Sequence, residues 1–471
     1  MLRNFVYEMR ERINFFAGLG NIICLLAILV IPSKILAQAT LEDFQKHPEY
    51  TLGTYMPYPE PGKDVKYTKA PAGYSPFYIS HYGRHGSRFH YSEKDYHDIY
   101  NILLGADQAN KLTPVGKQLL AAAQILELRA APRKGDLTQV GVRQHEGISR
   151  RMQKNFPEVF RNRIVRGKKV APSVNAIAST SGRCIVSMGA FMGELRKNAP
   201  NVNVSYISGA SVMPFINTLN FDSVGYSKAP AYAAELTKLW DKVDPNPLMS
   251  KLFTDSTYVQ KNIQTVDFYN TLYEVTTSMA GMDSSLIMLV NLNASYKGAD
   301  SVFSLGSLFT EEERFLLWQT KNAWWYSILG TSPLINSKAG VRWANSILQH
   351  ILDEAERVIA MKETPVAATL RFGHDTGLLP LAGLMQLSVA SAKVSDISRL
   401  YEQWDNFQVI PMAANLQIVF YKNGNKPILV KFLYNEREVT APIPCGADKC
   451  PAAPYYRWED VLKYYRSILS E

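Results

Sequence analysis

The residues best suited to chemistry lie in one stretch, Phe77 to Arg88, whose composition changes halfway along. Its first half is apolar and aromatic and predicts a buried strand, whereas two glycines, two arginines and a histidine occur within the six residues that begin at Gly83. The guanidinium groups of Arg84 and Arg88 each present a planar fork of donors that suits phosphate oxygens. His85 lies between them, where it could attack a bound phosphorus atom. The alternative is a surface loop with two arginines and a core histidine.

Two further predicted strands end in polar residues of a complementary kind. The strand Val174 to Ser179 leads into a helix that begins near Arg183, and the strand Val366 to Phe372 is followed by His374 and Asp375. Because strand ends in an open α/β sheet converge on one crevice, we expect these residues to meet the Arg84–Arg88 loop there. Taken singly, Arg183 could be a helix-surface arginine and Asp375 a helix cap.

Together these residues predict phosphoryl transfer without a metal or other cofactor. Three arginines can neutralise and orient a phosphate monoester before reaction. A neutral histidine is a capable nucleophile, and the nearby cationic groups lower its pKa. Asp375 is the candidate general acid for the leaving alcohol and then the general base for the hydrolytic water.

A metal site is the competing interpretation of the histidines. His81, His85 and His90 are closely spaced, but His81 falls on a predicted strand and no glutamate companion motif is present. The cysteines do not supply a zinc site either. A local disulfide between Cys445 and Cys450 is predicted instead, with Cys184 free.

The pattern of elements predicts an α/β fold with an open, mainly parallel sheet, helices on both faces and an inserted helical domain. Helices are expected between Asp95 and Arg129 and from Thr138 to Asn155, where they would cover the sheet. A strand is expected at Val202 to Ile207, and a long helix from Val341 to Met361. The remaining predictions are a helix from Leu378 to Leu387, a hairpin of Leu416 to Tyr421 with Ile428 to Leu433, and a final helix from Trp458 to Leu469.

We expect four segments along the chain. They are a signal peptide at 1–39, the first part of an α/β phosphatase domain at 40–212, an inserted helical domain at 213–340, and the second part of the α/β domain at 341–471. Residues 40–75 are expected to run extended across the surface. Inside the insertion Thr310 begins a capping box, and the tryptophans at 318, 324 and 325 are expected in its core rather than on a sugar-stacking platform.

The first 39 residues are typical of an export signal. Arginines at positions 3, 10 and 12 precede an apolar run from Phe15 to Ile31, and small residues allow cleavage after Ala37 or Ala39. A retained membrane anchor is the alternative. After removal of the segment, with four basic and two acidic residues, the chain keeps a formal charge of about +7, which can steer an anionic substrate. We expect a periplasmic or secreted protein without stable membrane insertion. Nothing in the sequence indicates nucleic-acid binding or an oligomeric state.

These motifs resemble the histidine acid phosphatases, the branch of the histidine phosphatase superfamily that includes phytases. The resemblance rests on Arg84-His85-Gly86-Ser87-Arg88 with the downstream His374-Asp375, and covers roughly 75–205 and 340–435. The closest resemblance is to multiple inositol polyphosphate phosphatases, through Leu137-Thr138-x-x-Gly141, Ser179 to Arg183 with Ser187, Ala190 and Phe191, and Leu378-Leu379-Pro380-Leu381. It implies that His85 is the phosphorylated nucleophile and Asp375 the proton donor. It also implies that the phosphoryl group is bound by Arg84, Arg88, Arg183 and His374.

The sequence departs from the family pattern at two places. Inositol polyphosphate phosphatases typically carry His-Ala-Glu where this chain has His374-Asp375-Thr376, which resembles the acid phosphatase and phytase version. Positional specificity on an inositol ring therefore does not carry over. His90-Tyr91 replaces the Pro-Thr usually found after the second arginine, so a phosphate contact through that threonine does not carry over either.

The sequence thus favours an exported phosphatase that acts on small phosphate monoesters, with inositol polyphosphates such as phytate the leading substrates. A broad-specificity acid phosphatase on sugar phosphates or nucleotides is one alternative. A mutase of the other branch is a second, although Arg88 and the export signal argue against it. A third is an exported phosphate-binding protein without turnover, which would release no phosphate from p-nitrophenyl phosphate.

Overall fold

The computed structural model describes residues 39–62, 65–217, 230–295, 304–335, 337–361, 363–446 and 450–471. Contacts join Ala39–Glu471 into one compact unit. The predicted signal segment, apart from Ala39, lies outside the described residues. Among the residues that are described, no helix is long and apolar enough to span a membrane.

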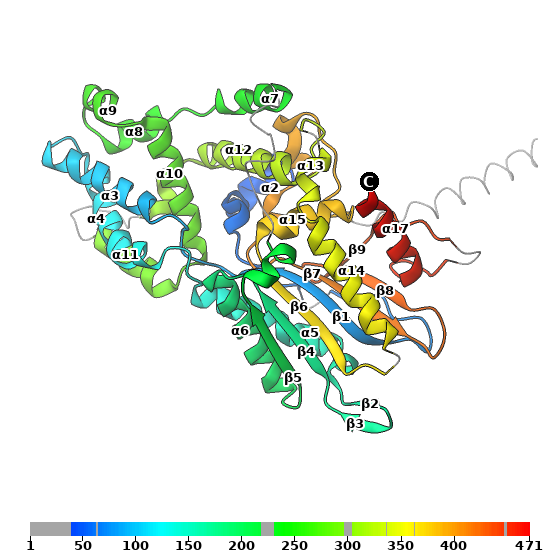
Figure 1. Ribbon diagram of the computed structural model, residues 1–471. Coiled ribbons are helices and arrows are strands. Elements are labelled where there is room, and N and C mark those ends of the chain that lie inside the picture. Colours follow the sequence, from blue (N-terminus) through cyan, green and yellow to red (C-terminus); the bar gives the residue numbers. More distant parts are fainter. Residues whose placement is uncertain are drawn as a thin grey trace, which may run out of the picture. The chain divides into compact units, whose positions relative to one another are not determined.

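An eight-stranded sheet forms the centre of the unit, in the order β10-β8-β7-β1-β6-β4-β5 with β9 beside β8 (Figure 1). The strands β1, β6, β4 and β5 are parallel, whereas β7, β8 and β10 add an antiparallel edge. The predicted strands and the hairpin are confirmed. The bounds are β1 (Ser75–Arg84), β4 (Ser173–Ala178), β5 (Asn203–Ser208), β6 (Val366–Gly373), β7 (Asn415–Lys422), β8 (Leu429–Tyr434), β9 (Arg437–Val439) and β10 (Tyr456–Arg457), with a separate hairpin of β2 (Arg163–Val165) and β3 (Lys168–Val170).

Helices cover both faces of this sheet, as predicted. On one face, α5 (Gln139–Asn155) and α6 (Gly182–Asn198) share a core with strand residues such as Ile79 and Leu370. On the other, α14, α15 and α17 share a core with strand residues such as Tyr82 (Figure 1). Their bounds are α14 (Asn345–Ala360), α15 (Asp375–Leu384) and α17 (Trp458–Ser470).

A third hydrophobic core is formed by side chains of several helices and of the first residues of the described chain. The predicted helical segment before residue 130 forms two helices, α3 and α4, with Thr113 capping the second. They do not cover the sheet as expected, because their buried side chains pack with α8, α10, α11 and α12. An amphipathic pattern gives the apolar face of a helix but not the element that this face meets. The bounds are α3 (Glu93–Gln108), α4 (Pro114–Arg129), α7 (Pro230–Trp240), α8 (Asn246–Leu252), α9 (Ser256–Asn262), α10 (Thr265–Ser278), α11 (Ser284–Ser295) and α12 (Glu311–Leu329).

Within this helical region, Thr310 forms the predicted capping box with Glu313. Trp318 is fully buried, and Trp324 and Trp325 are partly buried against the neighbouring core. The prediction that the tryptophans pack in the interior is confirmed for Trp318.

Three local expectations require correction. The segment before β1 is not simply extended, because Thr40 forms a capping box with Asp43 and starts α2 (Leu41–Lys46), which η1 (Pro48–Tyr55) follows. The predicted helix from 341 to 361 is interrupted between α13 (Ser337–Arg342) and α14. The helix predicted from 378 begins at Asp375, since His374 and not Asp375 is its N-cap residue.

The cysteines are arranged as predicted. Cys445 and Cys450 form a disulfide, and Cys184 is free and buried in α6.

Candidate active site

The register of the parallel strands brings the predicted site residues together. Arg84 at the end of β1 pairs with Gly373 of β6, and Ala178 of β4 pairs with Phe372. The three strands therefore end side by side. The predicted site residues lie at these three ends, as the sequence predicted. They are Arg84 to Arg88 at the end of β1, Arg183 after β4, and His374 with Asp375 after β6.

Arg84 is fully buried and lies beside Asp375. Its Nη2 is 2.7 Å from Asp375 Oδ2, and its Nη1 donates to the carbonyl oxygens of Thr54 and Ile410 at 2.7 and 2.6 Å. Burial lowers the pKa of Arg84 to about 10, although Asp375 opposes the shift. Burial acts to raise the pKa of Asp375, but Arg84 and His374 outweigh it and hold that pKa below its usual value. The unliganded site therefore favours a charged aspartate.

The backbone and ring of His85 are both held in place. Its backbone N–H donates to Gly373 O at 3.0 Å, and its carbonyl accepts from Ala413 N at 2.9 Å. The ring Nδ1 donates to Gly86 O at 2.9 Å, which leaves Nε2 with the lone pair of a neutral imidazole. Burial, and then the charges of the three arginines, lower the pKa of His85 well below its usual value. The geometry and the electrostatics both favour a neutral His85 whose Nε2 can act as a nucleophile.

His374 links the second and third strand ends. Arg183 Nη2 donates to His374 Nδ1 at 3.4 Å, so the ring proton lies on Nε2, which donates to Ser179 Oγ at 3.0 Å. The His374 ring meets the His85 ring edge to face, with centroids 5.5 Å apart. Burial, reinforced by Arg183, lowers the pKa of His374 to about 4. His374 is thus a neutral group beside His85.

Arg88 approaches the site between two tyrosine rings. Its guanidinium carbon lies 5.1 Å from the ring centroid of Tyr55 and 5.6 Å from that of Tyr91. Sequence reasoning did not find Tyr55, or Thr54 with its carbonyl on Arg84, because both lie in the segment that was expected to cross the surface. No motif marks these two residues. The capping box at Thr40 was a readable sign that this segment folds.

Each of the three arginines has a buried Nε with no hydrogen-bond partner among the described residues. Asp375 is the acidic group in contact with Arg84, and no acidic side chain forms an ion pair with Arg88 or Arg183 in the described part of the chain. Buried cations are costly unless an anion compensates them. The arrangement therefore suits a tetrahedral oxyanion that can accept from all three guanidinium groups.

The other histidines of this stretch do not join His85 in a metal site. His81 lies in the core against Phe191 and Phe372, and His90 bonds to Tyr55 and Asp95. Across the described residues, no group of three or more histidine, cysteine, aspartate or glutamate side chains could hold a metal ion.

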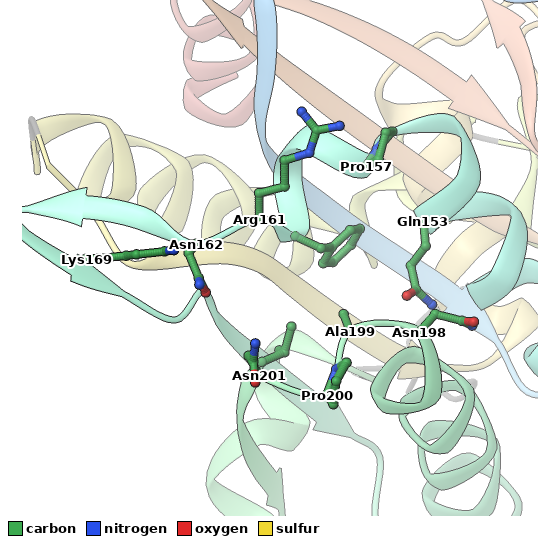
Figure 2. A pocket seen from close by; sticks show the side chains of 11 residues that line it. Gln153, Pro157, Arg161, Asn162, Lys169, Asn198, Ala199, Pro200 and Asn201 are labelled. Atoms are coloured by element: carbon green, nitrogen blue, oxygen red, sulfur yellow. The ribbon is translucent and has the colours of Figure 1, made fainter.

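A separate surface pocket of about 610 Å³ lies at the opposite edge of the sheet (Figure 2). Lys169 and Asn201 precede the strands β4 and β5, and Gln153 and Asn198 are at the ends of α5 and α6. The pocket contains none of the predicted site residues, and the candidate active site remains at the carboxyl ends of the strands.

The comparisons with known proteins agree with this arrangement. Curated protein sequences give no significant match. Among solved structures, the multiple inositol polyphosphate phosphatase of Bifidobacterium longum in complex with inositol hexasulfate has a TM-score of 0.68 at 17% sequence identity, covering 87% of this chain and 96% of that one. The complex of the same enzyme with phosphate has a TM-score of 0.66 at 16% identity, covering 89% and 97%. The phytase from D. castellii has a TM-score of 0.60 at 15% identity, covering 94% of this chain and 89% of that one.

At these identities the solved structures establish a shared fold. A profile of the histidine phosphatase superfamily (branch 2) matches residues 83–435, which is most of the chain and spans every predicted site residue. The chain therefore belongs to the histidine phosphatase superfamily, branch 2.

Proposed function

We propose that this protein hydrolyses phosphate monoesters through a phosphohistidine intermediate on His85. The observation that carries the proposal is a neutral His85 under the charges of three arginines, each of which has a buried Nε without a hydrogen-bond partner among the described residues. Such donors are in place before charge develops on the phosphoryl oxygens, which is where preorganised electrostatics lower a barrier most.

The first transfer forms a bond from His85 Nε2 to phosphorus and breaks the bond to the ester oxygen. Arg84, Arg88, Arg183 and His374 would bind the phosphoryl oxygens, and Asp375 would give a proton to the departing alcohol. In the second transfer the Asp375 carboxylate takes a proton from water as the water attacks phosphohistidine. Inorganic phosphate leaves and His85 is restored.

The protonation state of Asp375 sets a condition on this scheme. Arg84 stabilises the charged carboxylate in the unliganded site, with 2.7 Å between Nη2 and Oδ2. A phosphate group that binds Arg84 competes for that guanidinium and places negative charge beside the carboxylate, and both effects raise the pKa of Asp375. Substrate binding would therefore help to protonate its own acid catalyst.

Inositol polyphosphates such as phytate are the substrate class that we favour. Two of the structures with the same fold are an inositol polyphosphate phosphatase bound to inositol hexasulfate and a phytase. The excess of basic residues would attract a highly charged substrate. We propose further that the first 39 residues direct the protein to the periplasm or outside the cell. A broad-specificity acid phosphatase remains the second candidate, because His374-Asp375 follows the acid phosphatase version of the motif.

The proposal is tested by phosphate release from a panel of phytate, sugar phosphates, nucleotides and p-nitrophenyl phosphate. We expect release in the presence of a chelator, with the highest kcat/KM on phytate. Highest kcat/KM on nucleotides or sugar phosphates would favour the second candidate. No release from any ester, combined with measurable binding of inorganic phosphate, would overturn catalysis in favour of a phosphate-binding protein.

A further inference from the structure

His90, the first of the two residues that replace the usual Pro-Thr after the second arginine, is hydrogen-bonded to Asp95 and to Tyr55, whose ring contacts Arg88. His90 Nε2 lies 2.6 Å from Asp95 Oδ2, and His90 Nδ1 lies 3.0 Å from the hydroxyl of Tyr55. The Tyr55 ring in turn contacts the Arg88 guanidinium. None of these three residues belongs to the predicted set of phosphate-binding groups.

The chemistry of the groups fixes the direction of the bond to Asp95. A carboxylate only accepts, so His90 Nε2 must donate to Asp95. His90 Nδ1 and the Tyr55 hydroxyl share the second hydrogen bond. Ser92 Oγ donates to the other carboxylate oxygen of Asp95 at 2.7 Å, which holds the carboxylate at the start of α3. These hydrogen bonds therefore fix the position of the Tyr55 hydroxyl relative to the start of α3.

Because Tyr55 and His90 are buried, the hydrogen bond between them is costly to lose. Tyr55 and His90 are both buried, and His90 has no exposed surface. A tyrosine hydroxyl left without a partner in such a place destabilises the folded site. Arg88 has few restraints of its own: its Nη1 donates to Phe89 O at 3.0 Å, while its Nε has no hydrogen-bond partner in the described chain. The rings of Tyr55 and Tyr91, which both contact the guanidinium, therefore restrict where it can lie.

We propose that Asp95, His90 and Tyr55 are positioning residues that hold Arg88 in the geometry for binding a phosphoryl group. The inference rests on the proposed function only in the identity of the anion, because it concerns a binding arginine and not a bond-breaking step.

A double-mutant cycle between His90 and Arg88 tests this role, with calorimetric binding of inorganic phosphate as one measurement and kcat/KM as the other. We expect His90→Ala to weaken both by about 10- to 100-fold, the scale expected when a binding group is misplaced by about an ångström. In an Arg88→Ala background the same substitution should change either quantity by less than about 3-fold, because the group that it positions is gone. Equal losses in both backgrounds would show a merely structural role and overturn the inference.

Milder variants guard against a folding defect, and a matched control addresses general effects on α3. Tyr55→Phe removes one oxygen and keeps the ring, and Asp95→Asn keeps the size of the side chain. Each should show the same coupling to Arg88 with a smaller loss, and absence of coupling in both would overturn the inference. His97→Ala is the control, because His97 is on the same helix as Asp95 but bonds to Glu127 and not to Asp95, His90 or Tyr55. It should leave phosphate binding unchanged.

The phosphate-binding measurement separates this inference from the proposed function. If the unaltered protein binds phosphate with the predicted coupling but hydrolyses no ester, the positioning role stands and the hydrolase proposal fails. If the unaltered protein hydrolyses esters but the cycle shows no coupling between His90 and Arg88, the hydrolase proposal stands and the positioning role fails.

Discussion

His85 combines a fixed tautomer with a site that disfavours its protonated form. Gly86 O accepts from Nδ1, and burial with three nearby arginines keeps the ring neutral. The same arginines supply the positive charge that a phosphate dianion needs. In the proposed mechanism one set of residues would therefore serve two requirements of nucleophilic attack on phosphorus, an unprotonated nucleophile and a neutralised electrophile.

A direct consequence is that the phosphoryl group should be trapped on His85. When turnover of a radiolabelled substrate is quenched rapidly, we expect protein-bound label that is stable in base and labile in acid, as phosphohistidine is. His85→Ala should carry none and should have lost activity, whereas His97→Ala, which alters a half-buried histidine paired with Glu127, should trap label as the unaltered protein does. Full activity of the His85→Ala protein would refute the assignment.

The role of Asp375 can be separated from that of His85 by the leaving group. An inositol or sugar alkoxide needs a proton as the P–O bond breaks, whereas p-nitrophenolate leaves readily without one. Asp375→Asn should therefore depress the pre-steady-state burst on an alkyl phosphate by about 10²–10⁴-fold and that on p-nitrophenyl phosphate far less. The burst reports the first transfer only. Equal losses on both substrates would leave Asp375 with a structural role as the partner of Arg84.

At the scale of elements, the site depends on a close approach between the loop after β1 and the start of α5. A Cβ on Gly141 would lie 2.3 Å from Ser87 O, and a Cβ on Gly86 would lie 2.6 Å from Gly141 Cα. Gln144, one turn further along α5, accepts from Ser87 N at 2.8 Å and donates to Ser87 Oγ at 2.9 Å. The helix thus fixes the loop that carries His85 and Arg88.

Alanine at position 141 should therefore displace this loop, even though alanine favours a helix by about 1 kcal/mol over glycine. The clash is with backbone atoms that cannot rotate away, so we expect kcat/KM to fall by about 10²-fold, on the scale of an ångström's misplacement. The matched control is Gly189→Ala in α6, where a Cβ would meet nothing within 4 Å. It should keep full activity and raise the free energy of unfolding by about 0.5–1 kcal/mol. An active Gly141→Ala protein would contradict the role given to α5.

At the scale of the whole molecule, the folded protein holds several buried histidines in the neutral form. Burial lowers the pKa of His81 and His145 to about 3 and that of His350 to about 4. Above the unfolded pKa of about 6.5 both states are neutral and these groups contribute no pH dependence. As the pH falls below 6.5 the unfolded chain takes up protons that the folded protein excludes, so stability is lost until the pH approaches 4 to 3.

Urea unfolding should therefore show a lower free energy of unfolding at pH 5 than at pH 7. Each such histidine contributes about 1.4 kcal/mol per pH unit well below 6.5. His145→Leu should flatten the dependence by about that amount, since it removes one titrating group. Phe372→Leu, beside His145 in the core, should lower stability without changing the pH slope. Unchanged slopes in both variants would contradict the assignment of His145 as a buried neutral group.

The sequence by itself determined the main strands and helices and the kinds of side chain at the strand ends. Apolar runs and capping residues located the strands at Phe77, Val174 and Val366 and the helix starts at Thr113, Thr138 and Thr310, because these signals are local in the chain. The rule that parallel strand ends share one edge then sufficed to predict that Arg84, Arg183 and Asp375 lie together.

Only the tertiary structure decided which groups surround those residues. Thr54 and Tyr55 contact the arginines from a segment with no periodicity, and α3 and α4 pack with other helices instead of the sheet. Likewise the structure shows that His374 and not Asp375 is the N-cap of α15, and that Asp375 lies 2.7 Å from Arg84. The physical reason is that hydrophobic burial is non-directional: a pattern records that a face must leave water, and the partner that covers it is set by the packing of the whole chain.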